Sequence, residues 1–310
     1  MENVLLIGND INNTNHGKSW NDLLGELKTW SGQGNHLTED EEKVPSSLIY
    51  ERIALTTLKS KNKQISESGL KQKIATWANN IAPTNIHREL AQISGSHILT
   101  TNYDLSLEKA LNKNFAEKNC TNKGLIKEQK YSIFRHFEVE GKKVWHLHGS
   151  LDKPNSINLG YEHYSGYLQA MRNYVATSPQ YTKSINGNRS LIHNLKNKDE
   201  FKVLSWLNLF FTQNIHILGL GLNFVEMHLW WLLTYRARKR FLLGSDFIKN
   251  SITYYYPKCF ESCSNTGQKI QLLKACDVIT KPVDGGIPAN KDDKYCRETY
   301  YQNLVKLLRK

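Results

Sequence analysis

The sequence lacks several features that would place the protein in a specialised class. None of its 310 residues belongs to an apolar run of about 18 residues, the length that spans a membrane. The segment Met1–Gly8 has neither the basic start nor the small-residue cleavage site of a signal peptide. Only five cysteines occur, at irregular spacings that predict neither a disulfide framework nor a zinc site. We therefore expect a cytoplasmic protein with no membrane segment and no metal.

The composition is that of a globular protein with a basic charge balance. Hydrophobic residues make up 39% of the chain and aromatic residues 10%, enough to bury a sizeable core. The formal net charge of +12 favours polyanionic partners, including nucleic acid. The basic residues are scattered, with local clusters at Lys59–Lys63 and Arg236–Arg240, and no nucleic-acid-binding motif accompanies them. We interpret them as a solvated basic face and treat nucleic acid only as an indirect partner.

Apolar segments alternate with helical ones in the pattern of a mainly parallel sheet with helices on both faces. Expected strands, including a hairpin of two, cover residues 4–8, 96–101, 131–139, 142–147, 215–218, 251–256 and 277–279. Apolar positions three and four apart predict helices over about 46–93, with breaks near 66–69 and 82–84. A second helical, aromatic-rich module is expected over about 151–213. The sequence thus predicts one Rossmann-like α/β domain over residues 1–310, with both helical segments inserted in its nucleotide-binding core.

Four turns at the ends of these strands carry residues suited to chemistry. Ligands of parallel sheets bind outside the carboxyl ends of the strands, so the four turns belong together. A glycine lets the backbone approach a phosphate, an amide or a carboxylate can hold a hydroxyl or a water, and a histidine exchanges protons near neutral pH. The turns are Gly8-Asn9-Asp10, Thr100-Thr101-Asn102-Tyr103-Asp104, His148-Gly149 and Gly219-Leu220-Gly221-Leu222-Asn223, the last followed by Glu226 at the start of a helix.

Each turn taken alone also has a purely structural interpretation. Tight strand-to-helix turns explain Gly8 and Gly219 without any ligand. An Asx-turn and a helix cap explain the neighbouring Asn and Asp after the second strand. His146 lies two residues before His148 and faces the same side if the strand persists, so either histidine could act.

The order and spacing of the four turns resemble the sirtuin superfamily, in particular the SIR2-like domains of bacterial anti-phage defence. That family has a glycine-rich first turn, a T-x-N-x-D strand end, a histidine before glycine and a late glycine-rich strand end. Gly8-Asn9, Thr100 to Asp104, His148-Gly149 and Gly219 to Leu222 match these in order. Trp20 to Leu24 also looks like the helix after the first turn, and the resemblance extends from about residue 4 to residue 284.

The resemblance implies that the protein binds NAD⁺ as its substrate and cleaves the bond between nicotinamide and C1′ of the ribose. Asn102 would orient the attacking water or the ribose, and His148 would handle protons at the nicotinamide ribose. Positioning and electrostatics around the developing positive charge would supply most of the rate. The further residues expected to contact the substrate are Gly8, Asn9, Asp10, Thr101, Asp104, Gly219, Gly221, Leu222 and Asn223.

Two departures from the family favour hydrolysis over protein deacetylation. Deacylating sirtuins carry a four-cysteine zinc module between the histidine and the late glycine motif, and residues 149–218 contain no cysteine. The first turn also lacks the usual second glycine and an arginine-bearing lid motif. Water would then replace acyl-lysine as the acceptor, which makes the protein an NAD⁺ glycohydrolase (NADase). The charge of Asp10 would oppose a nearby pyrophosphate, so the identity of the phosphate-binding residues stays open.

An unregulated NADase would kill its host, so the resemblance to abortive-infection effectors implies that the activity is gated. We expect a separate regulatory subunit, such as a nucleotide-sensing protein, an ATPase or an Argonaute-like protein, or a homo-oligomer. The aromatic-rich segment Trp206–Trp231 is a candidate contact, although Trp230 and Trp231 more simply pack in the core. The alternatives are a non-catalytic sensor of NAD⁺ or ADP-ribose and a nucleic-acid-binding protein. Whether cyclic ADP-ribose is also formed stays open.

Overall fold

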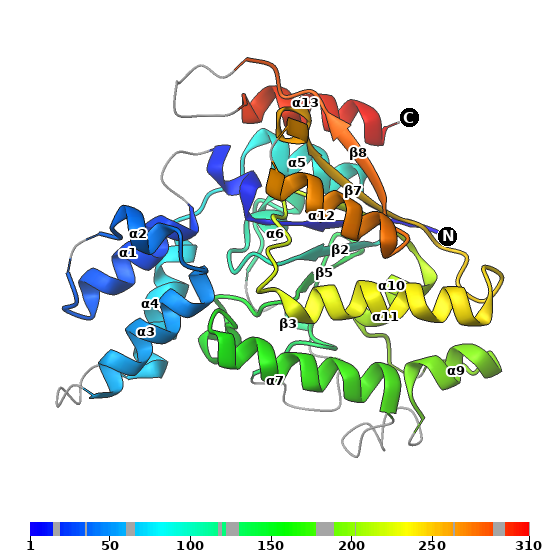
Figure 1. Cartoon of the computed structure of the whole chain (residues 1–310), viewed down its shortest axis with the longest axis horizontal. Helices are drawn as coiled ribbons and strands as arrows, with labels where there is room; N and C mark the ends of the chain where they lie inside the picture. The colour runs from blue at the N-terminus through cyan, green and yellow to red at the C-terminus, as the bar shows by residue number, and fades with distance from the viewer. Residues whose placement is uncertain are drawn as a thin grey trace.

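A mixed eight-stranded sheet forms the centre of the protein (Figure 1). The computed structural model describes residues 1–14, 19–34, 36–59, 66–116, 120–121, 130–177, 189–201, 203–262, 264–287 and 295–309. The strand order is β3-β4-β5-β2-β1-β6-β7-β8. The bounds of the strands are β1 Asn3–Ile7, β2 His97–Thr100, β3 Cys120–Thr121, β4 His136–Val139, β5 Lys142–His146, β6 Asn214–Leu218, β7 Ile252–Pro257 and β8 Ile279–Val283.

Six neighbouring strands, from β5 to β8 in the sheet order, run parallel, and only β3 and β4 are antiparallel to their neighbours. The expected α/β class with a mainly parallel, Rossmann-like sheet is confirmed. The hairpin turn at Glu140-Gly141 is also confirmed, although its first strand begins at His136 rather than Tyr131. The last strand was placed too early, because Asp277 adopts a positive φ of 58° in the turn that follows the preceding helix.

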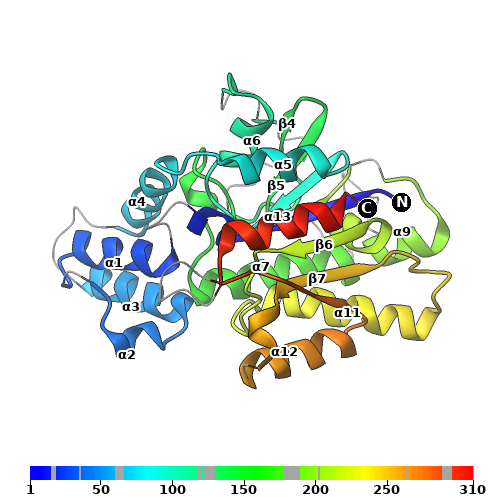
Figure 2. The ribbon, with the colours of Figure 1, turned by 90° about the horizontal axis from the view of Figure 1, so that it is seen from above.

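Alternate residues of β1 face two separate hydrophobic clusters, as the pleat of a strand requires. Leu5 and Ile7 pack in one cluster with α5 (Asn85–Ile93) and α13 (Arg297–Leu308). Val4 and Leu6 pack in the other, with α10 (Trp206–Thr212) and α11 (Met227–Leu243). Figure 2 shows α13 and α5 lying over one face of the sheet. Apolar residues at successive strand positions are therefore required, because helices cover both faces.

Of the helices between β1 and β2, α1 to α4 form a group beside the sheet, at the left of Figure 1, whereas α5 lies over the sheet next to α13. Their bounds are α1 Trp20–Trp30, α2 Glu39–Glu42, α3 Ser46–Lys59, α4 Glu67–Asn79 and α5 Asn85–Ile93. Side chains of Ser19, Ser66 and Thr84 cap the N-termini of α1, α4 and α5. Such caps satisfy backbone N–H groups that have no partner within the helix. The predicted break near 82–84 is confirmed, whereas residues 67–69 of the other predicted break already belong to α4, whose N-cap is Ser66. The helix α2 is a short addition that the periodicity did not reveal.

The helices between β5 and β6 cover the opposite face of the sheet. Their bounds are α7 Tyr161–Arg172, the π-helix η4 Asn173–Thr177, α9 Leu191–Asn197 and α10 Trp206–Thr212. The short helix α6, Ser106–Leu111, lies between β2 and β3 in the chain. Trp206 is fully buried, and Trp230 and Trp231 pack against the same cluster, which confirms their core interpretation. No helix among the described residues is long and apolar enough to cross a membrane.

The basic cluster Arg236–Arg240 is a solvated face only in part, because Arg238 is exposed but Arg236 is not. Arg236 is completely buried, and its guanidinium donates to the carbonyl oxygens of Phe210 and Asn250. Arg240 forms an ion pair with Asp277 at 3.1 Å. A planar guanidinium with five donors suits such a junction between two helices and a loop. The other cluster falls on residues 59–63, of which only Lys59 lies within the described residues.

Candidate active site

The carboxyl ends of four strands meet at one edge of the sheet. Ile7 at the end of β1 lies level with Thr100 of β2 and with Leu218 of β6. Thr100 in turn lies level with His146 of β5. The four turns singled out from the sequence therefore leave the sheet at the same height, because parallel strands in register end together. This edge is where parallel α/β sheets bind their ligands.

A cavity of about 310 Å³ opens at this edge. Seven of the predicted site residues line it, namely Asn9, Asp10, Thr101, His148, Gly219, Gly221 and Asn223. Four others, Gly8, Asn102, Asp104 and Leu222, do not line it. The wall also contains Asn13, Ser19, Trp20, Asn21, Ser46, Leu159, Tyr164, Leu220, Val225 and Glu226. The structure thus brings most of the predicted set together around one cavity and adds residues from α1, α7 and the start of α11.

Gly8 is required by the contact between two turns. A Cβ atom at this position would lie 2.3 Å from the carbonyl oxygen of Gly219, closer than any real contact. Gly219 itself has a positive φ of 61°, a conformation that glycine adopts without strain. The two glycines let the ends of β1 and β6 approach each other at the floor of the cavity. Leu222 also has a positive φ, but its side chain is buried in the core.

Asp10 does not present an uncompensated charge to the cavity. Its carboxylate accepts hydrogen bonds from the hydroxyls of Tyr295 and Tyr301 at 2.7 and 3.0 Å. Arg297 donates to the other oxygen at 3.1 Å and forms an ion pair with it. The repulsion expected between Asp10 and a pyrophosphate is therefore weakened by a guanidinium and two hydroxyls that the local sequence did not reveal.

The polar side chains after β2 are buried and mostly bonded to the protein. Asp104 accepts from Asn12 Nδ2 at 2.8 Å and from the backbone N–H of Ser106 at 3.0 Å, the latter at the start of α6. Asn102 is 3% exposed, and its Nδ2 lies 3.5 Å from the carbonyl oxygen of Gly8. Its Oδ1 has no hydrogen-bond partner within the described part of the chain. Asn102 thus keeps one acceptor unused, whereas Asp104 works as a helix cap.

The two histidines of β5 and its turn have different surroundings. His146 is the last residue of β5, and its Nδ1 and Nε2 atoms contact the carbonyl oxygen of Asn102 at 2.7 Å and Glu108 at 2.8 Å. Burial alone would lower the pKa of His146, but the Glu108 carboxylate and the Asn102 carbonyl outweigh it and raise the pKa.. The strand ends before His148, which lines the cavity. The structure therefore places only His148 at the cavity.

His148 is held by a second histidine that the sequence did not single out. Its Nε2 lies 2.8 Å from the Nε2 of His228 on α11, and both rings are almost fully buried. The ring of Tyr164 on α7 stacks on His228 with 4.9 Å between centroids. Burial lowers the pKa of His148 to about 3. The pKa of His228 also falls far below its usual range, because its ring is buried and lies beside His148. Both imidazoles are therefore neutral and share one proton between their Nε2 atoms.

Glu226 is a further wall residue that the sequence indicated only as a helix start. Its Oε2 accepts from the backbone N–H of Asn223 at 2.8 Å. Burial raises the pKa of Glu226 to about 7, against the opposing effects of that N–H group and of Lys269. A carboxyl group that titrates near neutral pH beside a cavity is suited to proton transfer. The only sequence signal for Glu226 was its position seven residues after Gly219, in the connection that follows β6.

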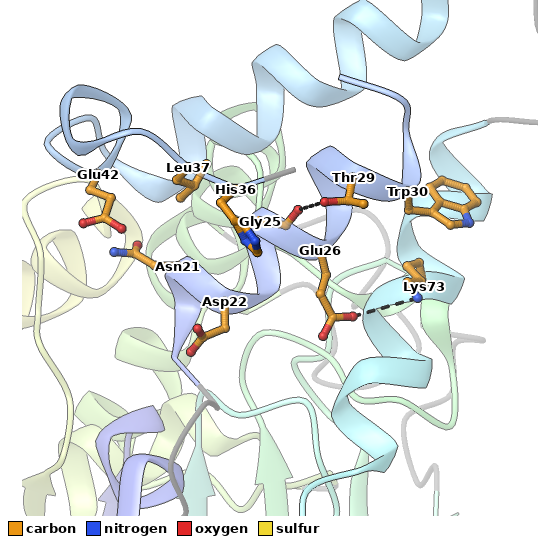
Figure 3. A pocket seen from close by; sticks show the side chains of 10 residues that line it. All are labelled: Asn21, Asp22, Gly25, Glu26, Thr29, Trp30, His36, Leu37, Glu42 and Lys73. Atoms are coloured by element: carbon orange, nitrogen blue, oxygen red, sulfur yellow. Dashed lines mark hydrogen bonds and ion pairs between the residues drawn. The ribbon is translucent and has the colours of Figure 1, made fainter. Parts of the chain in front are cut away.

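Two other cavities adjoin this one. An aromatic cavity of about 410 Å³ shares Asp10 and residues 219–221 with it, and its other wall residues include Tyr254, Tyr256, Phe260, Lys269, Tyr295, Arg297 and Tyr300. A wider cavity of about 690 Å³ lies on the outer side of α1 (Figure 3). There Glu26 faces Lys73 at 3.9 Å, and Asn21 is the one residue shared with the strand-end cavity. Its greater size does not make it the site, because none of the strand-end turns reaches it.

Comparison with known protein families identifies one part of the chain. Residues 96–194 match the family model of the SIR2-like domain, a segment that runs from β2 through the His148 turn to α9. No curated protein matches the sequence. The match to a SIR2-like domain implies NAD binding. The matched segment carries Asn102 and His148 to the ligand-binding edge of a parallel sheet, so this part of the chain is similar to a SIR2-like domain.

Proposed function

We propose that the protein is an NAD⁺ glycohydrolase that cleaves NAD⁺ to nicotinamide and ADP-ribose. The observation that carries this proposal is the cavity at the strand ends. His148 and the glycine turn after β6 line it together, and Asn102 is buried nearby in the turn after β2. Residues 149–218 contain no cysteine, so the four-cysteine module of deacylating sirtuins is missing from that interval. The missing module supports hydrolysis over transfer of an acyl group from lysine.

The two joined cavities support an extended ligand such as a dinucleotide. The nicotinamide ribose would lie beside His148, and the adenosine would reach the aromatic cavity between β7 and α13. Residues 219–221 line both cavities, and the backbone there can approach a pyrophosphate closely. Arg297 and Lys269 would offset the phosphate charge beside Asp10. This arrangement gives Asn102 and His148 the reacting end of the ligand.

The residues at the reacting end would act by binding and positioning. Asn102 would use its free Oδ1 to hold the attacking water or a ribose hydroxyl. His148, fixed through His228, would bond the nicotinamide ribose. Departure of nicotinamide neutralises its pyridinium charge, and surrounding dipoles would stabilise the oxocarbenium-like centre left behind. Water excluded from the rest of the cavity would limit side reactions.

We further propose that the activity serves anti-phage defence and is gated by a partner subunit or by oligomerisation. Within the segment Trp206–Trp231, Phe224 is 58% exposed beside the cavity and is the residue best placed to contact such a partner. A constitutive NADase would deplete the cell of NAD⁺, which is the reason to expect a gate. The partner would be a nucleotide-sensing protein, an ATPase or an Argonaute-like protein.

The proposal is tested by incubating the purified protein with NAD⁺, alone and with candidate partners, and measuring nicotinamide and ADP-ribose by chromatography. Stoichiometric release of the two products is expected once the gate is relieved. A thermal-shift titration with NAD⁺ runs in parallel, because binding to the folded state raises its stability. Binding without release under every condition would instead identify a sensor, and a lack of both would overturn the NAD⁺ site.

A further inference from the structure

Hydrolysis of NAD⁺ requires a group that takes up the proton of the attacking water. Among the described residues that line the strand-end cavity, four have a titratable side chain: Asp10, His148, Tyr164 and Glu226. An effective proton acceptor must have a free lone pair in the cavity and a basic form that is populated near neutral pH. The surroundings of the four groups distinguish them.

Asp10 and Tyr164 do not meet these conditions. The Asp10 carboxylate is already bonded to Tyr295, Tyr301 and Arg297, so its lone pairs and its charge are largely occupied. Burial, reinforced by the charge of Glu226, raises the pKa of Tyr164, which therefore keeps its proton near neutral pH. Neither group can therefore accept a proton from a bound water.

His148 is constrained by His228. The Nδ1 atom of His228 is buried and has no hydrogen-bond partner within the described residues. A buried N–H without a partner is rarer than a buried lone pair, so the proton of His228 belongs on Nε2, from which it donates to His148 Nε2. The proton of neutral His148 must then sit on Nδ1. In this tautomer His148 offers the cavity a hydrogen-bond donor rather than a lone pair.

Glu226 is left as the group with a free acceptor. One carboxyl oxygen accepts from Asn223 N–H, and the other has no hydrogen bond among the described residues. We propose that Glu226 is a catalytic residue that accepts the proton of the water attacking C1′, while His148 donates to a ribose oxygen; this rests on the proposed hydrolysis of NAD⁺. The C1′–N bond breaks and its electron pair leaves with neutral nicotinamide. The water oxygen forms the new bond to C1′, and its proton passes to the carboxylate and then to solvent.

The charges around Glu226 set the pH at which it can act. Burial raises its pKa to about 7, while the N–H of Asn223 and the ammonium of Lys269 on α12 (Ser264–Ala275) lower it. The phenols of Tyr103 after β2, Tyr164 on α7 and Tyr254 on β7 also face it, all neutral in this pH range. The carboxylate form therefore predominates only above about pH 7.

The test compares Glu226→Gln with the wild-type protein under the conditions that release the gate. Gln keeps the side-chain length and an oxygen for Asn223 N–H, but it cannot accept a proton. The expected result is a fall in kcat of about 100-fold with KM within about threefold. The decline of wild-type kcat below pH 7 should be absent from the variant. Glu39→Gln, which alters an exposed carboxyl at the start of α2, is the matched control and should behave as wild type.

The outcomes separate this proposal from the function on which it rests. Wild-type kcat and an unchanged pH profile in Glu226→Gln would overturn the role of Glu226 and leave NAD⁺ hydrolysis standing. An equal loss of kcat at all pH values with a large rise in KM would show a binding role and also overturn it. NAD⁺ binding without cleavage by the wild type would remove both proposals together.

Discussion

The turns after β2 and after β6 contribute to the site in different ways. After β2, Asn102 and Asp104 are almost completely buried. Both carboxylate oxygens of Asp104 accept hydrogen bonds, one from Asn12 and one from the backbone at the start of α6. After β6, Gly219, Gly221 and Glu226 line the cavity itself. The turn with the more distinctive sequence thus provides mainly the frame. The turn with fewer distinctive side chains provides most of the surface that a ligand can touch.

The difference follows from where the next helix begins. After β2, α6 starts only six residues beyond Thr100, so short polar side chains bond at once to the backbone of the turn and the helix. After β6, α11 starts nine residues beyond Leu218. The longer connection contains two glycines and a left-handed Leu222, and it runs along the cavity before the helix begins. Each prediction below perturbs one side of this comparison.

The largest effect is expected from His148→Ala, which removes the histidine that contacts α11. Nicotinamide release should fall about 1000-fold while the circular dichroism spectrum stays unchanged. His146→Ala is the comparison on the β2 side. It should reduce kcat less but lower the free energy of unfolding by about 3 kcal/mol, because it leaves the buried Glu108 without its partner. A greater loss of kcat in folded His146→Ala than in His148→Ala would reverse the roles assigned to the two histidines.

Asn102→Ala tests the one open acceptor on the β2 side. Its Oδ1 has no partner in the described protein, so the change should remove about 100-fold or more of NAD⁺ cleavage with little loss of stability. Asp104→Ala provides the contrast, because it removes the acceptor of the Ser106 N–H at the start of α6 and should cost about 1 kcal/mol in urea unfolding. Full activity in Asn102→Ala would show that this residue belongs to the frame alone.

Gly8→Ala tests the contact between the first and last turns. The added methyl group would collide with the carbonyl of Gly219, so we expect a loss of about 2 kcal/mol in denaturant unfolding. Gly267→Ala, in the interior of α12, is the matched control. Its Cβ would meet nothing within 4 Å, and helix propensity predicts a gain of up to about 1 kcal/mol. Equal stability of the two variants would mean that the turns separate without cost.

The smallest effect concerns the pH dependence of stability. The folded-state pKa of Glu226 is about 7, above its ordinary value of 4.5, so the folded protein holds this proton more tightly than the unfolded chain. That stabilisation is complete below pH 4.5 and is lost as the pH rises through about 7. The Tm of Glu226→Gln relative to wild type should therefore rise by about 2 °C between pH 5 and pH 8. A constant difference across this range would show that burial does not perturb Glu226.

The buried histidine pair has the opposite pH dependence. Its folded-state pKa values lie below the ordinary value of 6.5, so the stabilisation is present above pH 6.5 and is lost as the pH falls towards about 3. Acid unfolding of the wild type should begin in this interval, since unfolding lets both rings take up protons. The pair and Glu226 thus limit stability from opposite sides of neutrality.

Local pattern was sufficient for much of the secondary structure. Helix caps such as Ser19 and Thr84 act within three residues, so the start of a helix depends on the local sequence. Strand positions were predictable because helices cover both faces and require continuous apolar runs, as in Val4–Ile7. The predicted start of β8 was wrong, because the turn at Asp277 depends on ion pairs with Arg236 and Arg240. These two arginines lie on a helix about 40 residues earlier in the chain.

The amino-acid sequence by itself determined the parallel α/β class and the four turns that meet at one edge of the sheet. These properties depend on short-range patterns: alternation, apolar runs, glycines and caps. Only the tertiary structure decided that His148 rather than His146 reaches the cavity, that Arg297 and two tyrosines bind Asp10, and that Glu226 lies half-buried in the cavity wall. The physical reason is that burial and pairing set the protonation state of a polar group and decide which of its hydrogen-bond donors and acceptors stay unused. The residues that bury or pair with such a group lie far away along the chain.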